Sequence, residues 1–189
     1  MLYLASQSPR RLELLRQLDV PFHALHAPVT ERRAQDETAA GYVSRVAREK
    51  AEAGLTQVTD DDSPWVLGAD TEVVLDGEVF GKPVDAADAA AMLRRLAGTA
   101  HEVISAVWLI GAQARFSAQC RSTVRFGTLA DDQIAAYVAT GEWQDKAGGY
   151  AIQSRAGALI EHLSGSYSAV MGLPLFETRT LLRDAGLMA

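Results

Sequence analysis

One Asp-Gly pair constrains the fold of this chain more than any other feature. Asp76-Gly77 separates an apolar run at residues 66–75 from a shorter run at residues 78–80. Asp-Gly between two strand-like runs is typical of a two-residue β-hairpin, because both central residues of its tight turn adopt positive φ. The pair therefore predicts two antiparallel strands and argues against a purely parallel sheet.

Strand-like and helical segments alternate along the rest of the chain. Ser8-Pro9 predicts a helix start, because serine is a favoured N-cap and proline is favoured at the first helical position. The expected helices cover residues 8–18, 38–55, 85–96, 130–139 and 173–184. The expected strands cover residues 2–5, 66–75, 78–80, 101–110, 150–153 and 158–163, with one or two more in 114–126. This order predicts an α/β fold with a mixed central sheet and flanking helices.

Length and composition indicate a single globular domain. The chain has 189 residues, of which 48% are hydrophobic, so one domain spanning 1–189 can bury a sizeable core. No signal peptide is recognisable at the N-terminus, and no apolar run is long enough to cross a bilayer. The single cysteine, Cys120, excludes an internal disulfide and is compatible with a reducing compartment. We therefore expect a cytoplasmic protein with no membrane partner.

The charge distribution points to a small anionic ligand. The net charge of −6 argues against a general nucleic-acid binder, which usually carries a basic excess. Arg10 and Arg11 lie in the first turn of the first expected helix, where the helix dipole makes each exposed cation cost about 0.3–1 kcal/mol. With Ser6 and Ser8 they predict a phosphate site at the helix N-terminus. The alternative is that both arginines simply point into water.

Lys50 lies on the apolar face of the helix expected at residues 38–55. It follows Ala47 by three residues and Val43 by seven, so the three side chains share one face. A buried lysine needs a partner for its charge. The spacing therefore leaves two interpretations open, namely a partner near the core or a side chain that reaches past the helix edge to water.

Asp70 and Thr71 interrupt the apolar run that precedes the hairpin turn. A carboxylate in such a strand is costly unless it binds a metal, pairs with a base or takes part in chemistry. Antiparallel pairing across the turn puts Lys82 roughly opposite Asp70 or Thr71. We interpret this as a catalytic carboxylate beside a phosphate-binding lysine, in preference to a purely structural ion pair.

Glu31 is a further carboxylate that bears on cofactor choice. Together with Asp70 it would complete an oxygen-rich site of the kind that Mg²⁺ or Mn²⁺ prefers. The four histidines lack the spacing of zinc ligands. The chain also has no Gly-x-x-x-x-Gly-Lys-Ser/Thr phosphate loop and no Gly-x-Ser-x-Gly nucleophile motif. The expected cofactor is therefore a divalent metal held by Asp70 and Glu31.

Short distinctive segments are spread along nearly the whole chain. They are Leu4-Ala5-Ser6-Gln7-Ser8-Pro9-Arg10-Arg11, Ala47-Arg48-Glu49-Lys50-Ala51, Gly68-Ala69-Asp70-Thr71, Gly81-Lys82-Pro83, Asp145-Lys146-Ala147-Gly148-Gly149-Tyr150, Ile152-Gln153, Gly165-Ser166-Tyr167 and Gly172-Leu173-Pro174. In their order and spacing these segments resemble the motifs of the Maf family, which makes the resemblance highly specific.

The resemblance implies both a fold and an activity. The fold would be elongated and two-lobed with a central cleft, like that of the inosine triphosphate pyrophosphatases, and often a homodimer. The activity would be hydrolysis of a nucleoside triphosphate at its α–β phosphoanhydride, which releases pyrophosphate. Carried over by motif, Asp70 would be the general base and a metal ligand, with Glu31 assisting the metal. The residues that would hold the triphosphate are Ser6, Arg11, Lys50 and Lys82.

Three positions sort substrates within the family. Arg10, Thr71 and Gln153 are similar to the branch that acts on dTTP and UTP, whereas the 7-methyl-GTP branch carries Trp, Gln and Glu there. The amide of Gln153 offers a donor and an acceptor, which suits a uracil or thymine edge. We therefore expect dTTP, UTP and modified uridine triphosphates as substrates, with 7-methyl-GTP and CTP as the alternatives.

A regulatory protein is an alternative of a different class. The family takes its name from inhibition of septum formation, so the chain would then act by binding a division partner. Binding alone does not need the dense set of ionisable residues around the expected strand and helix start. A pyrophosphatase is therefore the preferred interpretation.

Overall fold

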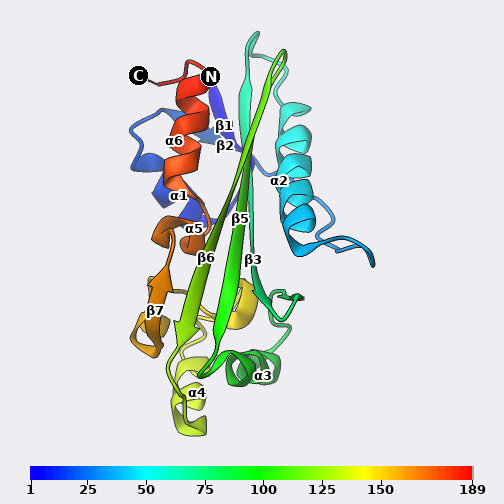
Figure 1. Ribbon diagram of the computed structural model, residues 1–189. Helices are drawn as coiled ribbons and strands as arrows, with labels where there is room; N and C mark the ends of the chain where they lie inside the picture. The colour runs from blue at the N-terminus through cyan, green and yellow to red at the C-terminus, as the bar shows by residue number, and fades with distance from the viewer. Residues whose placement is uncertain (189) are drawn as a thin grey trace.

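A seven-stranded mixed sheet runs along the elongated molecule in the computed structural model, which describes residues 1–188 (Figure 1). The strands are β1 (Leu2–Leu4), β2 (Phe22–Ala24), β3 (Trp65–Leu75), β4 (Glu78–Phe80), β5 (Ala100–Gly111), β6 (Arg115–Phe126) and β7 (Ile160–Ser164). Their order is β2-β1-β3-β5-β6-β7, and β4 pairs with β3. Only the pairs of β1 with β2 and β3 are parallel in the described part of the chain. The expected mixed sheet is therefore confirmed.

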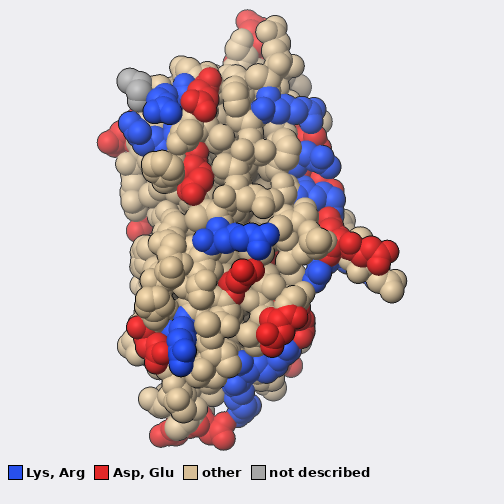
Figure 2. All heavy atoms as spheres, viewed as in Figure 1, with Lys and Arg blue, Asp and Glu red and all other residues tan. Residues whose placement is uncertain are grey.

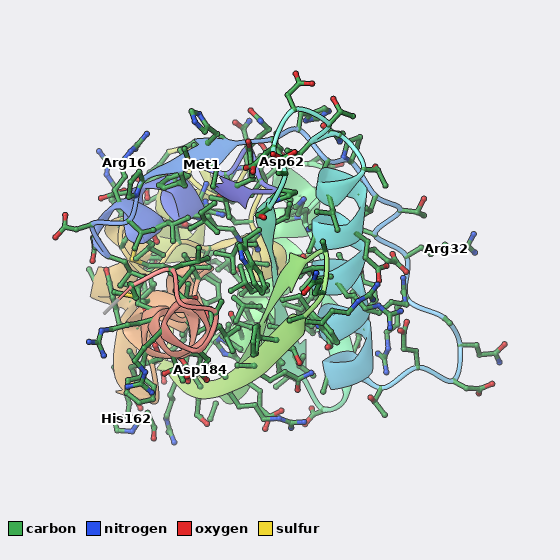
Figure 3. All side chains as sticks on the ribbon, turned by 90° about the horizontal axis from the view of Figure 1, so that it is seen from above. Met1, Arg16, Arg32, Asp62, His162 and Asp184 are labelled. Carbon is green, nitrogen blue, oxygen red and sulfur yellow. The ribbon has the colours of Figure 1, made fainter. Side chains whose placement is uncertain are left out.

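Helices cover both faces of this sheet (Figures 1 and 3). The α-helices are α1 (Pro9–Arg16), α2 (Ala39–Leu55), α3 (Ala86–Leu96), α4 (Asp131–Val138), α5 (Tyr167–Met171) and α6 (Leu175–Asp184), and the 3₁₀ helices are η1 (Ala147–Gly149) and η2 (Arg155–Leu159). α2 packs against β3 and β5 on one face, whereas α5 and α6 pack against β5 and β6 on the other. α3 and α4 lie together at the end of the sheet opposite the chain termini.

β3 is buried on both of its faces because helices cover each side. Val74 packs with apolar residues of α2. Leu67, on the opposite face, belongs to the large cluster that contains Leu173 and residues of α1 and α6. Because successive side chains of a strand point to opposite faces, Asp70 and Thr71 face different sides of the sheet. The strand β3 therefore presents a carboxylate on one face of the sheet and a hydroxyl on the other.

Four differences separate the expected elements from the observed ones. Residues 114–126 hold one long strand, which is within the expectation of one or two, but β2 has no counterpart among the expected strands. The short helix α5 has no counterpart among the expected elements, and β7 begins only at Ile160, after η2. The strand expected at residues 150–153 is wrong, because this segment is a loop.

The loop at residues 150–153 satisfies its backbone groups without a neighbouring strand. The chain bends sharply just before it, where Gly148 and Gly149 have φ values of 69° and 70°. The amide of Ala151 donates to the hydroxyl of Tyr137 at 3.3 Å, and its carbonyl accepts from the amide of Ser154 at 3.0 Å. A buried segment with its polar groups paired in this way has no need of a sheet ladder.

Acidic and basic side chains are interspersed over the face of the molecule shown in Figure 2. Several exposed groups pair across elements, for example Arg95 with Glu78 at 2.6 Å. Exposed pairs of this kind contribute little to stability, because water and salt screen their attraction. Within residues 1–188, no helix combines the length and apolar character needed to cross a membrane.

Candidate active site

A cavity of about 510 Å³ opens beside the middle of β3. β1 pairs with residues 65–67 of this strand and β4 with residues 73–75, so the edge between them has no partner strand within residues 1–188. Asp70, in that stretch, is the single expected site residue that does not line the cavity. The nine that line it are Ser6, Ser8, Arg10, Arg11, Glu31, Lys50, Thr71, Lys82 and Gln153.

Lys50 connects Asp70 to the cavity. Its Nζ donates to Oδ1 of Asp70 at 2.8 Å and lies 2.6 Å from Oε1 of Glu31. The side chains of Lys50 and Asp70 are only 10% and 7% exposed, and Oδ2 of Asp70 has no hydrogen-bond partner among the residues described. Of the two interpretations of Lys50, the structure therefore shows the one with a partner near the core.

Close contact between α2 and β3 sets this geometry. A Cβ atom at Gly68 would lie 2.1 Å from the carbonyl oxygen of Ala47 and 2.7 Å from the amide nitrogen of Ala51. The helix backbone therefore rests directly on the strand, which only glycine allows at this position. Lys50 lies between the two helix residues, and Asp70 lies two residues beyond Gly68 on the same strand face. The contact therefore brings the two charged groups together.

Lys82 has a different partner from the one that the hairpin predicts. The ladder between β3 and β4 ends at Val73 and Phe80, so Lys82 lies in the loop that follows β4. Its Nζ donates to Oε2 of Glu31 at 3.2 Å. The structure thus pairs Lys82 with Glu31 in place of Asp70, and the two lysines share Glu31 between them.

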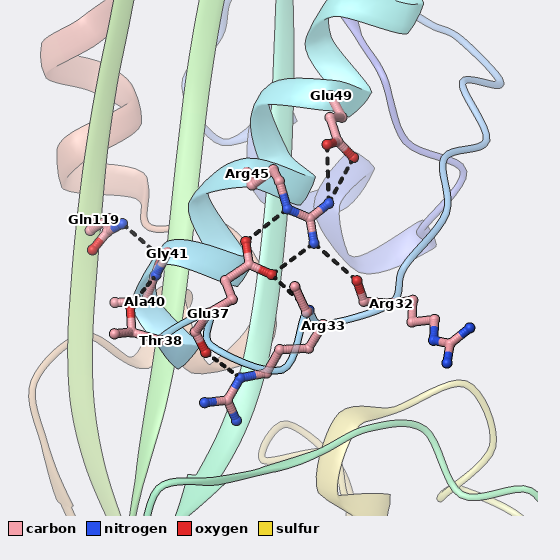
Figure 4. A network of polar contacts seen from close by, with 10 residues as sticks. Arg32, Arg33, Glu37, Thr38, Ala40, Gly41, Arg45, Glu49 and Gln119 are labelled. Atoms are coloured by element: carbon pink, nitrogen blue, oxygen red, sulfur yellow. Dashed lines mark hydrogen bonds and ion pairs between the residues drawn. The ribbon is translucent and has the colours of Figure 1, made fainter.

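Glu31 belongs to a loop that α2 holds in position. Arg45 of this helix donates to both carboxylate oxygens of Glu37, at 2.7 and 2.9 Å, and to the carbonyl oxygen of Arg32 at 3.0 Å (Figure 4). The side chain of Arg32 points away from this network (Figure 4). Burial alone would raise the pKa of Glu31, but the two lysine ammonium groups lower it to about 2. Glu31 is therefore an ionised carboxylate at the cavity wall.

Glu72 is a cavity residue that the sequence analysis does not single out. It is 9% exposed, lines the cavity, and has a buried Oε2 without a hydrogen-bond partner in the described part of the chain. Burial, and then the neighbouring charges of Asp70 and Glu31, raise its pKa to about 8. Its position two residues after Asp70, and hence on the same strand face, is the signal that could have identified it.

The start of α1 forms the basic wall of the cavity. Ser8 occupies the N-cap position, but its side chain makes no capping bond, and no acidic residue lies in the first turn. Arg11 donates from Nε to the carbonyl oxygen of Gly172 at 2.8 Å. Burial, and then the charge of Arg11, lower the pKa of Arg10. Both arginines thus line the cavity instead of simply pointing into water.

Hydroxyl and amide groups also line the part of the cavity beside the opposite face of β3. Oγ1 of Thr71 lies 2.8 Å from Oγ of Ser105, and Gln153 is an exposed residue of the rim. Tyr150 also lines the cavity, and its hydroxyl lies 2.8 Å from Nε2 of the buried His101. No ammonium, guanidinium or carboxylate group takes part in these bonds.

Comparisons with known proteins agree on one family. A sequence profile of the Maf family, described as Maf-like protein, matches residues 1–185. A dTTP/UTP pyrophosphatase of Xanthomonas euvesicatoria pv. vesicatoria (strain 85-10) is 60% identical over 189 residues, which cover 98% of this chain and 99% of that protein. A nucleoside triphosphate pyrophosphatase of Xylella fastidiosa (strain M23) is 53% identical over 184 residues, which cover 96% of this chain and 97% of that protein.

A solved structure supports the same architecture. The Ham1 protein of Staphylococcus aureus matches with a TM-score of 0.52 and 14% identity, over 97% of this chain and 98% of that chain. At this identity the likeness concerns the fold alone, and it agrees with the expected mixed α/β architecture. The profile match and the two relatives extend over almost the whole sequence. The chain therefore belongs to the Maf family.

Proposed function

We propose that this protein hydrolyses dTTP and UTP, and modified uridine triphosphates, to the nucleoside monophosphate and pyrophosphate. The names of its relatives, dTTP/UTP pyrophosphatase and nucleoside triphosphate pyrophosphatase, support this substrate class. The observation that carries the proposal is a continuous chain of charges at one cavity. In this chain Lys82 contacts Glu31, Glu31 contacts Lys50, and Lys50 contacts Asp70.

The basic groups of the cavity would hold the triphosphate. The start of α1 offers free backbone N–H groups and the positive end of the helix dipole, next to Ser6, Ser8, Arg10 and Arg11. Lys50 and Lys82 would approach the phosphates from the other side. These cations would stabilise the charge that develops on the phosphoryl oxygens and on the departing pyrophosphate.

Asp70 would act as the general base. A water oxygen attacks the α-phosphorus, the α–β anhydride bond breaks, and pyrophosphate leaves with the bonding electron pair. The proton of the water passes to the carboxylate of Asp70. Because Lys50 separates Asp70 from the cavity, ligand binding has to draw this ammonium towards the phosphate oxygens.

A divalent metal, Mg²⁺ or Mn²⁺, is the proposed cofactor. Oδ2 of Asp70 and Oε2 of Glu72 are buried oxygens without partners, and such hard donors suit either ion. No three His, Cys, Asp or Glu side chains within residues 1–188 form a ready-made ligand group, and the Lys50 ammonium lies between Glu31 and Asp70. The donor chemistry therefore fits. Asp70 and Glu31 would hold the ion beside Glu72, and it would neutralise phosphate charge when bound.

The proposed cellular setting is the cytoplasm, where nucleoside triphosphates are available, and the proposed assembly is a homodimer, as the family resemblance implies. Size-exclusion chromatography with light scattering measures the assembly directly. A monomer at micromolar concentration would contradict the dimer without affecting the catalytic proposal.

A panel of canonical and modified nucleoside triphosphates tests the activity. Purified protein with Mg²⁺ or Mn²⁺ is expected to release pyrophosphate, and no orthophosphate, from dTTP and UTP far faster than from CTP or 7-methyl-GTP. Orthophosphate as the first product, or equal rates on all bases, would contradict the proposal. If an inactive Asp70→Asn variant still blocked septation in cells, a regulatory role would stand beside the enzymatic one.

A further inference from the structure

Ser105 is a fully buried polar residue that no expected role accounts for. It lies on β5 with 0% exposure, and its hydroxyl contacts two other groups. Oγ lies 2.6 Å from the carbonyl oxygen of Ala169 in α5 and 2.8 Å from Oγ1 of Thr71. Thr71 is the neighbour that reaches the cavity. Ser105 thus connects a cavity residue to the protein interior.

The donor and acceptor roles in the two hydrogen bonds of Ser105 follow from the chemistry of the groups involved. A carbonyl oxygen accepts hydrogen bonds and cannot donate them, so the single hydroxyl proton of Ser105 goes to Ala169. Ser105 then has only lone pairs left for Thr71. Thr71 must therefore be the donor in the second bond, and its own proton points towards β5, away from the cavity. What Thr71 presents to the cavity is a hydrogen-bond acceptor.

We propose that Ser105 is a positioning residue that fixes Thr71 as an acceptor and thereby selects a base with an N–H donor at the facing atom. This inference rests on the proposed function, because it concerns the base of the same substrate. The pairing edge of uracil or thymine has one donor, N3–H, between two carbonyl oxygens. Cytosine has a bare lone pair at N3, which would face the lone pairs of Thr71. The hydrogen bonds from Thr71 to Ser105 and from Ser105 to Ala169 therefore favour uracil and thymine over cytosine.

The energetic effect is that of one hydrogen bond. A neutral hydrogen bond contributes about 0.5–1.5 kcal/mol net, which corresponds to roughly 2- to 10-fold in affinity. Without Ser105, the Thr71 hydroxyl can rotate and donate into the cavity, so a ring nitrogen with a lone pair becomes acceptable. The expected result is a loss of discrimination between bases, in KM much more than in kcat, because Thr71 is not one of the groups that contact the reacting phosphate.

Ser105→Ala tests this directly, with Ser122→Ala as the matched control. Ser122 is also a buried serine, at 2% exposure, and it bonds to the start of α5 through Ser166 without touching Thr71. Each variant is assayed for turnover of UTP and CTP. Affinities for the non-hydrolysable α,β-imido analogues of both nucleotides are measured by calorimetry.

Ser105→Ala is expected to lower the UTP-to-CTP ratio of affinities by roughly 2- to 10-fold, whereas Ser122→Ala leaves the ratio at its wild-type value. Thr71→Ser keeps the same chain of hydroxyls and is expected to retain the ratio, and Thr71→Val to lose it. If the ratio is unchanged in Ser105→Ala, or falls equally in Ser122→Ala, the inference is overturned. Should Ser105→Ala not fold, Thr71→Val decides, since unchanged UTP preference there also overturns the inference. Selective analogue binding without pyrophosphate release would instead reject the proposed function alone.

Discussion

The two faces of β3 differ in chemistry although they come from adjacent residues. On the α2 face, Asp70 lies in a group of charges with Lys50 and Glu31, and Glu72 is a buried carboxyl group beside them with a raised pKa. On the opposite face, Thr71 takes part in a chain of neutral hydroxyls. The alternation of the strand thus separates its own carboxyl groups, which suit a metal, from its neutral hydroxyl, which suits a base, although the basic start of α1 also packs on the Thr71 side. Substitutions on one face should change rate, and those on the other should change selectivity or stability.

The largest expected effect is that of Asp70→Asn. The amide cannot accept the proton of the attacking water, and general-base groups typically contribute 10²- to 10⁴-fold, so pyrophosphate release should fall by about a thousandfold or more. The base preference of any residual activity should not change. Circular dichroism and thermal melting check that the fold is intact. Full turnover by this variant would remove Asp70 from the mechanism.

Lys82→Ala should reduce kcat/KM by about a hundredfold, which is typical of losing one group that stabilises transition-state charge. Arg115→Ala is a suitable control, because this exposed cation pairs with Glu52 and does not line the cavity. Steady-state kinetics on UTP measures both variants. Equal kinetics for Lys82→Ala and the control would mean that Lys82 serves only to pair with Glu31.

The buried His101 provides a test based on how the stability of the protein depends on pH. Burial lowers its pKa from about 6.5 when unfolded to about 4 in the folded protein. The unfolded chain therefore binds a proton that the folded chain excludes, and stability is lost as the pH falls from 6.5 towards 4. Between pH 7 and pH 5 the loss should be roughly 2 kcal/mol.

Denaturant unfolding of the wild type and of His101→Gln at both pH values isolates this contribution, because glutamine does not titrate. The wild type should lose more stability than the variant on acidification, while turnover at neutral pH changes less than in Asp70→Asn. Identical pH dependence in the two proteins would show that His101 is not the titrating group.

Glu72→Gln should weaken Mn²⁺ binding to the nucleotide-free protein by roughly tenfold, a magnitude typical of groups that support a metal site. Glu102→Gln is the control, since Glu102 is a half-exposed strand residue paired with Arg121. Electron paramagnetic resonance of free Mn²⁺ measures the affinity. Unchanged affinity in Glu72→Gln would place Glu72 outside the metal site and leave Asp70 and Glu31 as the proposed ligands.

Local sequence signals predicted most of the fold. The turn at Asp76-Gly77 and the helix start at Ser8-Pro9 have direct physical causes within a few residues, and the structure has both. The strand expected at residues 150–153 failed because its backbone groups bond to Tyr137 and to a local turn. No periodicity in a single sequence reports bonds of that kind.

In the candidate site, too, features with local causes could be predicted, whereas features that depend on distant contacts could not. The spacing of Lys50 on its helix left a partner near the core as one of two interpretations. The isolation of Asp70 in an apolar run required a metal, a basic partner or a role in chemistry, and the structure shows that Lys50 and Asp70 pair with each other. The pairing of Lys82 with Glu31 depends on a loop whose path is set by Arg45, so the hairpin alone gave the wrong partner. Glu72 could have been found from its two-residue offset to Asp70.

The contact at Gly68 limits how this pocket can be remodelled. Main-chain atoms of α2 touch the strand with no side-chain layer between them, so compensating substitutions nearby have no volume to redistribute. Even a methyl group there must push the helix outwards and widen the gap that Lys50 spans. The spacing of helix and strand is therefore a fixed dimension of the scaffold.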